Sequence, residues 1–488
     1  MSHIDWIGFD MDYTLAIYDQ EAMDRLSIDV TAARLVKRGY PSWVTTIPYD
    51  TGFPIRGLLI DKKYGHVVKM DRYKAVGKAY RGFRQLTKDQ LRTIYHSTKL
   101  RAPTSRYHFI DTLYALSEAA VYAGIIDAYD ARGVQIDHAK LFADIREAID
   151  EAHRDGTVYA AITSDIGKYI KRDPELAQTL HKLRSAGKKL FILTNSRRSY
   201  TELVMSHLLG SASAEYPTWR HYFDTLIVAA SKPAFFQEHR PIMERVHEDR
   251  DDSQMRPAQG LERGKIYEGG NLHDLERMLG VSGDKILYVG DHIYGDILRS
   301  KKESAWRTAM IIQEMDTEVA AHETCEGALD QATELEERRA RLEDELRYHQ
   351  ARFKEVQREL DVLAATGPRA RVVGATALAT EPAPRRSNGN GRSVGDLEAE
   401  RQRAKRAVER VRTLLREIEA ESRALEQSVD QTFHPYWGSL LKEGVETSSF
   451  GDQVEEYACL YTSRVSNFFH YSPLQTFRSP RDLMPHEL

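Results

Sequence analysis

Residues 4–15 read IDWIGFDMDYTL, an apolar run that is typical of a buried strand and that stops abruptly at Asp10. A second carboxylate, Asp12, follows two positions later. Because the chain turns at the carboxyl end of a strand, the two acids can flank one small pocket, at the edge where open α/β sheets bind ligands. An Asp-x-Asp sequence after a strand also fits an ordinary solvated turn. The rest of the chain has to distinguish these two interpretations.

Three later segments repeat the pattern of an apolar strand that ends in polar residues. They are Gly187–Ser196 (GKKLFILTNS), Thr225–Pro233 (TLIVAASKP) and Lys285–Asp296 (KILYVGDHIYGD). Since the carboxyl ends of parallel strands share one edge of a sheet, their polar residues are predicted to meet Asp10 and Asp12 there. Taken singly, each has an ordinary alternative: Asn195 as a helix cap, Lys232 in a surface turn, Asp291 in a plain loop.

The composition limits the class of protein. With 488 residues, 41% hydrophobic and 29% charged, the chain is long enough for two or three packed units. A formal net charge of −4 gives no reason to expect a nucleic acid partner. Two cysteines argue against a disulfide scaffold and fit a reducing compartment. With no secretory leader and no apolar run of about 18 residues, we expect a soluble cytoplasmic protein with no membrane partner.

The expected α/β core comprises residues 1–19 and 181–321, and residues 20–180 form a cap inserted after the first strand. Within the cap, Arg56–Met70 is predicted to form two short strands around a tight turn. Apolar residues at spacings of three and four predict helices at Thr87–Tyr95, Phe109–Tyr122 and Leu141–His153.

Residues 322–430 are rich in Glu, Arg, Leu and Ala and are predicted to form an antiparallel helical coiled coil. Its tip, residues 366–395, is rich in Pro, Gly, Ser and Ala and is predicted to be mobile or disordered. Residues 431–488 carry many aromatic residues, which predicts that this segment packs on the core or at a subunit interface.

The residues at the predicted sheet edge suit phosphoryl transfer through an aspartyl-phosphate. Asp10 would attack phosphorus, and Mg²⁺ bound by Asp10, the Asp12 carbonyl and Asp291 would offset the repulsion between two anions. Lys232 and the Thr194 hydroxyl would hold the phosphoryl oxygens. Asp12 would protonate the departing alkoxide and then take a proton from the hydrolytic water.

The sequences at the strand ends resemble the motifs of a known superfamily. DMDYT, TNS, SKP and GDHIYGD resemble motifs one to four of the haloacid dehalogenase (HAD) superfamily. FDMDYTLA, FPIRGLLID, IYEGGNLHDL, GDHIYGDIL and LMPHE resemble the cytosolic purine 5′-nucleotidases that act on IMP and GMP. The resemblance covers most of residues 5–313 and 431–487 and omits the coiled coil. It implies an α/β, HAD-type Rossmann-like core with a cap inserted after the first strand.

The resemblance also implies roles for individual residues. Asp10 would be the nucleophile, Asp12 the acid and base, and Lys232 a further catalytic residue. The implied Mg²⁺ ligands are Asp10, Asp12 and Asp291, with Asp296 in support. The implied phosphate contacts are Thr194, Asn195, Ser196 and Lys232.

The purine-recognition helix of that family resembles FADIREAIDEAH, residues 142–153. It implies that Arg146 and Asp150 face the base with His153 nearby, and Tyr114 stands where the family has a stacking aromatic. An Arg that donates to a 6-oxo group and an Asp that accepts from purine N–H groups favour 6-oxopurines. The alternatives are an exposed i, i+4 ion pair and a core tyrosine. Tyr159 stands where the family has a lysine, so the exact base preference is open.

The family is also activated by nucleotides and forms tetramers. A similar effector site would comprise Arg101, Asp111, Tyr294, Lys302 and Gln453, with Asp111 replacing an amide. ATP is the expected effector, and a homotetramer or dimer is the expected assembly.

These observations predict a Mg²⁺-dependent 5′-nucleotidase that hydrolyses IMP and GMP and can pass the phosphoryl group to a nucleoside. One alternative is a HAD phosphatase for another phosphomonoester. Another is a coiled-coil interaction protein on an inactive HAD scaffold.

Overall fold

The structure is a computed structural model that describes residues 1–96, 100, 104–210, 215–246, 254–366, 392–478 and 484–487. The chain forms two compact units. One comprises Met1–Ala320 together with Tyr436–Leu488, and the other comprises Ala321–Pro435. All described residues of the predicted catalytic, base-binding and effector sites fall in the first unit.

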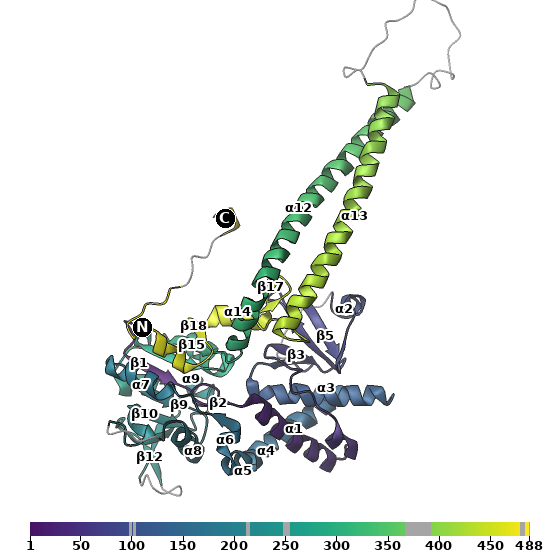
Figure 1. Cartoon of the computed structure of the whole chain (residues 1–488). Helices are drawn as coiled ribbons and strands as arrows, with labels where there is room; N and C mark the ends of the chain where they lie inside the picture. Colours follow the sequence, from purple (N-terminus) through teal and green to yellow (C-terminus); the bar gives the residue numbers. More distant parts are fainter. Residues whose placement is uncertain are drawn as a thin grey trace, which may run out of the picture. The chain divides into compact units, whose positions relative to one another are not determined.

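A nine-stranded sheet, counted over the described residues, forms the centre of the first unit (Figure 1). Its order is β12-β11-β13-β10-β9-β1-β14-β15-β18. The strands are β1 (Trp6–Phe9), β9 (Lys189–Leu193), β10 (Thr225–Val228), β11 (Ile242–Arg245), β12 (Met255–Pro257), β13 (Ile266–Gly269), β14 (Ile286–Gly290), β15 (Arg307–Ile311) and β18 (Leu460–Thr462). From β13 to β18 all neighbours are parallel, and β11 and β12 are antiparallel additions at one edge. The four strands predicted to share an edge, β10, β9, β1 and β14, are therefore parallel neighbours.

Both faces of the sheet are covered, which explains why its central strands are apolar throughout. Phe9 of β1 belongs to a large hydrophobic cluster with residues of α7 and α8, and Trp6 belongs to a second cluster with residues of α9 and α10. These helices are α7 (Leu176–Ser185), α8 (Arg198–Leu209), α9 (Ala234–Gln237) and α10 (Leu272–Leu279), and the short α11 (Arg299–Glu303) follows β14.

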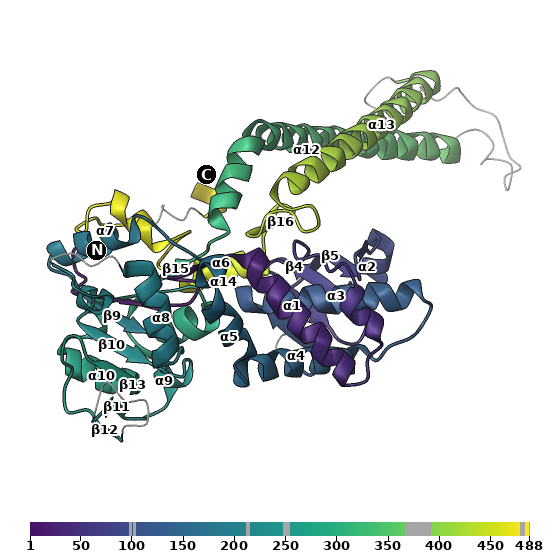
Figure 2. The ribbon, with the colours of Figure 1, turned by 60° about the horizontal axis from the view of Figure 1, so that its bottom comes forward.

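An insertion leaves the core directly after the first strand. The short strands β2 (Ile17–Tyr18) and β8 (Ile170–Lys171) pair antiparallel and enclose residues 19–169, hereafter the cap. The cap sheet has the order β6-β5-β4-β3-β7, and Figure 2 shows α1, α3 and α4 gathered beside it. The cap strands are β3 (Leu58–Asp61), β4 (His66–Met70), β5 (Val76–Arg81), β6 (Arg84–Gln85) and β7 (Tyr107–Ile110). The cap helices are α1 (Gln20–Lys37), α2 (Lys88–Tyr95), α3 (Leu116–Ala131), α4 (His138–Arg154), α5 (Thr157–Ser164) and α6 (Ile166–Tyr169).

The predicted helix at Phe109–Tyr122 is wrong in its first half. Phe109 and Ile110 belong to β7, where they pair with Leu59 and Leu58 of β3. Helix α3 begins only at Leu116. The strand partner lies far upstream in the chain, so local periodicity could not reveal it.

The C-terminal part of the first unit packs on both the cap and the core. Trp437 is fully buried, and its indole N–H donates to the Phe53 carbonyl at 2.6 Å. The strands β16 (Lys442–Glu443) and β17 (Glu446–Thr447) and the helix α14 (Ser449–Tyr457) follow. Strand β18 then extends the central sheet beside β15.

The second unit is a helical hairpin, formed by α12 (Met315–Thr366) and α13 (Val394–Phe433), which lie side by side in both views (Figures 1 and 2). Val356, Val411 and Ile418 are buried along the predicted seam. Of the predicted tip, residues 367–391 lie outside the described residues. Its last two residues, 394 and 395, belong to α13, which Ser393 caps through a hydrogen bond to the Asp396 N–H.

The α/β class, the Rossmann-like core with its parallel strands, the insertion after the first strand and the helical hairpin are thus confirmed. None of the described helices combines the length and the apolar character that crossing a bilayer requires.

Candidate active site

The first acidic loop follows β1. The Asp10 N–H donates to the Val289 carbonyl at 2.8 Å, which keeps the sheet register up to the first acid. Asp10 Oδ1 accepts the Met11 N–H at 2.8 Å. Tyr13 has a φ of 56°, a left-handed conformation that is strained for a residue with a side chain. This strained residue directly follows Asp12.

The second acidic loop follows β14. At Gly290, the last strand residue, a side chain is excluded because a Cβ atom would lie 2.6 Å from Asp296 Cβ. Asp291 follows directly, and Asp296 lies on a single π-helical turn, η5 (Ile293–Leu298). One carboxylate oxygen each of Asp10, Asp291 and Asp296 lies within 4.8 Å of the others. These three residues are the candidate metal centre.

Lys232 brings one positive charge into this cluster. Its Nζ lies 2.9 Å from Asp10 Oδ1 and 2.6 Å from Asp296 Oδ1. It also donates to the Tyr288 hydroxyl at 2.8 Å. The ammonium group is buried, so its three donors are all used within the protein.

The loop that carries Lys232 is strained and is held by a neighbouring strand end. Ala229 and Ser231 both have left-handed φ values, 47° and 60°. The Asn195 amide donates to the Lys232 carbonyl at 2.9 Å, and its oxygen accepts the Lys232 N–H at 2.5 Å. Asn195 thus fixes the backbone of Lys232, and the cap of the following helix is Arg197.

The carboxylates of the cluster are short of positive charge. Burial raises the pKa of Asp10 to about 7, against the opposing effect of Lys232. Burial and the neighbouring Asp296 and Asp10 raise the pKa of Asp291 well above its usual range. Burial opposes the charge of Lys232, but Asp10 and Asp296 outweigh it and raise the pKa of Lys232.

The candidate metal centre fits a hard divalent cation. Its three carboxylates face the single ammonium of Lys232, so two negative charges remain when all three are ionised. Carboxylate oxygens are the ligands that Mg²⁺ prefers. The donor set and the charge deficit therefore both match Mg²⁺.

Asp12 has a different environment from the metal centre. Its Oδ1 accepts the Tyr18 hydroxyl at 2.6 Å, and its Oδ2 accepts the Ser196 hydroxyl at 2.5 Å. Burial raises the pKa of Asp12, while these two hydrogen bonds lower it. The Thr194 hydroxyl, fully buried, accepts the Ser196 N–H at 3.1 Å. All of the predicted catalytic and phosphate-binding residues therefore meet at one sheet edge.

The predicted base-binding residues lie on the cap. The rings of Tyr114 and Tyr13 meet edge to face with centroids 4.7 Å apart, which places Tyr114 beside the first acidic loop. His153 meets Tyr114 at 6.1 Å, and Asp150 is exposed on the same helix, α4. Arg146 contacts His108 Nε2 at 3.1 Å and Glu118 Oε2 at 3.3 Å.

The predicted effector residues are only partly grouped. Tyr294, Lys302 and Gln453 lie on η5, α11 and α14, and the Lys302 ammonium lies 5.3 Å from the ring centroid of Tyr457. Arg101 lies outside the described residues. Asp111 lies after strand β7, and its charge acts on Arg56 and Glu118.

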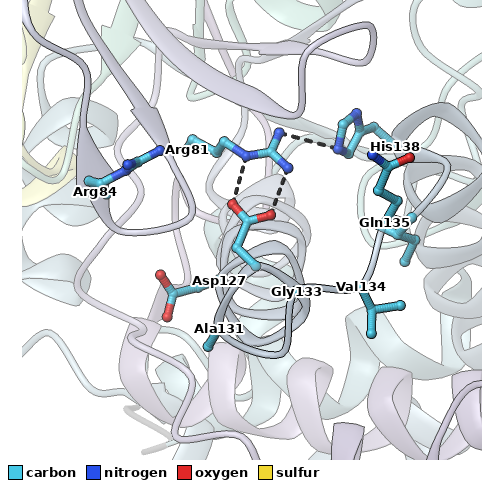
Figure 3. A pocket seen from close by; sticks show the side chains of 10 residues that line it. Arg81, Arg84, Asp127, Ala131, Gly133, Val134, Gln135 and His138 are labelled. Carbon is cyan, nitrogen blue, oxygen red and sulfur yellow. Dashed lines mark hydrogen bonds and ion pairs between the residues drawn. The ribbon is translucent and has the colours of Figure 1, made fainter.

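A separate hollow of about 790 Å³ lies on the cap near Arg84 and Asp127 (Figure 3). Arg81 in its wall donates to both carboxylate oxygens of Asp130, at 2.6 and 2.7 Å, and to the Tyr64 carbonyl. These partners occupy donors of Arg81 that an anionic ligand would otherwise bind. Its described lining residues include none of the predicted site residues.

The residues that support the site but were not predicted from the sequence include Tyr18, Tyr288, Arg56, Gln313 and Glu314. Tyr288 stands in an apolar strand, where a tyrosine indicates core packing. The contacts of Arg56 and Gln313 reach residues more than 200 positions away. No local signal in the sequence points to such contacts.

Several known proteins are similar to this chain. A family model described as the 5′ nucleotidase family matches residues 1–488. A 5′-nucleotidase domain-containing protein of Dictyostelium discoideum is 28% identical over 100% of this chain and 73% of its own length. The human 5′-nucleotidase domain-containing protein 2 is 32% identical over 64% of this chain and 61% of its own length. A predicted phosphoglycolate phosphatase from Haemophilus somnus is a distant structural neighbour, with a TM-score of 0.26 and 14% identity over 64% of this chain and 86% of that one.

Proposed function

The chain belongs to the 5′ nucleotidase family, and on that premise we propose that it is a Mg²⁺-dependent hydrolase of purine nucleoside 5′-monophosphates, with IMP and GMP as substrates. The observation that carries the proposal is the meeting of Asp10, Lys232, Asp291 and Asp296 at one sheet edge. The relatives named above are longer than this chain, so their names do not by themselves fix its substrates.

Asp10 is the proposed nucleophile. Lys232 and the Met11 N–H both bind Oδ1, and among the described residues no donor contacts Oδ2. Oδ2 therefore attacks phosphorus, a P–O bond to Asp10 forms, and the P–O5′ bond of the nucleotide breaks. When bound, Mg²⁺ supplies positive charge that offsets the repulsion between the carboxylate and the phosphate.

Asp12 is the proposed acid and base. Its raised pKa favours the protonated state, from which it gives a proton to the departing O5′. The resulting carboxylate then takes a proton from the water that attacks the aspartyl-phosphate. Phosphate leaves, and Asp10 returns to its carboxylate form. A nucleoside hydroxyl in place of that water would give phosphotransfer.

The cap is proposed to select the base. Tyr114 supports the stacking role because its ring adjoins the first acidic loop. Arg146 would donate to the 6-oxo group and Asp150 would accept a purine N–H, with His153 beside them. This assignment favours IMP and GMP over AMP.

A homo-oligomer, activation by ATP and a cytoplasmic location stay predictions. Turnover of IMP with and without ATP tests the effector site. Equal turnover at every ATP concentration would remove that part of the proposal.

The central test measures phosphate release from IMP, GMP, AMP, UMP and a simple aryl phosphate with Mg²⁺. Asp10→Asn should lower turnover at least a thousandfold, and Asp29→Asn, an exposed aspartate on α1, should not. Arg146→Ala should impair purine nucleotides selectively, with Arg154→Ala on the same helix as its control. Equal losses on all substrates would favour another phosphomonoester, and full activity of Asp10→Asn would favour an inactive scaffold.

A further inference from the structure

Arg56 joins the cap to the second acidic loop. It lies just before β3, and only 1% of its surface is exposed. Its Nε and Nη2 donate to the two oxygens of Glu314 at 2.7 and 2.5 Å. The remaining nitrogen, Nη1, donates to the Asp291 carbonyl at 3.1 Å. A planar guanidinium can make these three contacts at once, whereas a lysine ammonium cannot reproduce the fork.

The packing around Arg56 leaves the guanidinium little freedom. Its Cζ lies 5.1 Å from the ring centroid of Phe450 on α14. The next residue, Gly57, has a φ of +87°, and a Cβ there would lie 2.5 Å from Phe450 Cβ. A larger residue at position 57 would push α14 away and open the space that fixes the arginine.

The residue before Glu314 reaches the first acidic loop. Gln313 Nε2 donates to the Tyr13 carbonyl at 3.0 Å. Tyr13 is the strained residue that directly follows Asp12. Gln313 and Glu314 come just after strand β15, whose pairing with β14 fixes their position relative to the sheet.

We propose that Arg56, Gln313 and Glu314 form a clamp that holds both acidic loops in the geometry needed to bind the divalent cation. The proposal rests on the proposed function, because it assumes that Asp10 and Asp291 bind a metal ion. The three residues are positioning residues: Arg56 and Gln313 touch the backbone of the loops, Glu314 holds the Arg56 guanidinium, and none of them touches the reacting atoms. Partners that orient metal ligands in this way typically contribute ten- to a hundredfold to metal affinity.

The test measures Mn²⁺ binding to the full-length protein by electron paramagnetic resonance, without substrate. We expect Arg56→Met to raise the Mn²⁺ dissociation constant about tenfold or more. Arg56→Lys should not restore the affinity, because it keeps the charge and loses the fork. Gln313→Met and Glu314→Gln, which are milder changes, should each weaken binding about threefold to tenfold. Glu314→Gln also tests the clamp if Arg56→Met fails to fold.

Arg106→Met is the matched control. Arg106 forms a bidentate pair with Asp61 at 2.8 and 2.6 Å, entirely within the cap. Its loss should lower stability in urea in the presence of EDTA much as Arg56→Met does, and should leave Mn²⁺ affinity unchanged. The Mg²⁺ concentration for half-maximal turnover should rise only in the clamp variants.

The outcomes separate the clamp from the function. If Asp291→Asn binds Mn²⁺ as tightly as the wild type, the assignment of the metal site is wrong. The clamp, which depends on that assignment, is then wrong as well. If Asp291→Asn loses binding while the Arg56, Gln313 and Glu314 variants keep it, the clamp alone is wrong. Equal weakening in Arg106→Met would show a general effect of cap stability and would also overturn the clamp.

Discussion

The hydroxyl of Tyr18 donates a 2.6 Å hydrogen bond to Asp12 Oδ1. Its oxygen lies 2.7 Å from the Tyr200 hydroxyl. Since the Tyr18 proton is directed to Asp12, Tyr200 has to be the donor to Tyr18. The Ser196 and Tyr18 hydroxyls thus favour the charged form of Asp12, against a burial effect that raises its pKa.

Tyr18→Phe should therefore raise the pKa of Asp12 further. Because the proposed mechanism needs protonated Asp12 in the first step, the basic limb of kcat/KM against pH should move to higher pH. Tyr200→Phe is the control, because it removes a hydrogen bond to Tyr18 and not one to Asp12. The basic limb of its kcat/KM profile should move less than that of Tyr18→Phe. If the basic limb of the Tyr18→Phe profile stays at the wild-type pH, the assigned role of Asp12 is contradicted.

Lys232→Met should destabilise the metal-free protein. It leaves Asp10 and Asp296 buried without their cation, a loss of roughly 3 kcal/mol in the free energy of unfolding. Mg²⁺ should recover part of this loss, because a divalent cation replaces the missing charge. Urea unfolding at pH 8.5, with EDTA or with Mg²⁺, measures both effects. Lys140→Met, at an exposed position of α4, should change stability by less than about 0.5 kcal/mol.

Mg²⁺ binding should release protons near neutral pH. The pKa of Asp10 is raised to about 7 by burial, so Asp10 is largely protonated at pH 6 and largely ionised at pH 8. A metal ion needs the carboxylate, and Mg²⁺ affinity should therefore fall about tenfold from pH 8 to pH 6. Calorimetry in two buffers of different ionisation enthalpy measures the released protons. Asp10→Asn should reduce this dependence, the remainder being due to Asp291, whose pKa burial and its acidic neighbours also raise, and an unchanged dependence would rule out Asp10 as a source of it.

Glu118 should influence base recognition through Arg146. It is buried, burial raises its pKa to about 7, and it lies 3.3 Å from Arg146 Nη1. Ionised Glu118 at pH 8 holds Arg146, and protonation at pH 6 releases it toward the base. The inhibition constant of inosine, which has no phosphate to titrate, should rise by roughly threefold from pH 6 to pH 8. In Glu118→Gln the inhibition constant of inosine should stay at its lower, pH 6 level at both pH 6 and pH 8. Glu147→Gln on α4 is the control and should show the pH dependence of the wild type.

The sequence was informative where chemistry and strand structure coincide. Asp10, Thr194, Lys232 and Asp291 follow apolar runs, and parallel pairing then brings strand ends together without further information. The groups that hold these residues were not predictable. Tyr288, Gln313 and Arg56 act across tertiary contacts, and each has an ordinary explanation in its own segment. The same reason explains β7, whose partner β3 overrides a helical pattern.

Asp24 on α1 should make stability depend on pH. It is 4% exposed, accepts a 3.0 Å hydrogen bond from Gln20, and burial raises its pKa from 3.8 to about 7. The unfolded chain loses this proton near pH 4 and the folded chain near pH 7. The stability due to neutral Asp24 is therefore complete below pH 4 and is lost as the pH rises to about 7, a change of up to about 4 kcal/mol. Asn at this position cannot ionise, so Asp24→Asn does not lose this stability. From pH 5 to pH 8 the unfolding free energy of Asp24→Asn should therefore rise relative to that of the wild type. Urea unfolding across this range measures the difference, with Asp29→Asn as the exposed control on the same helix, and a constant difference would mean that Asp24 does not titrate in the folded protein.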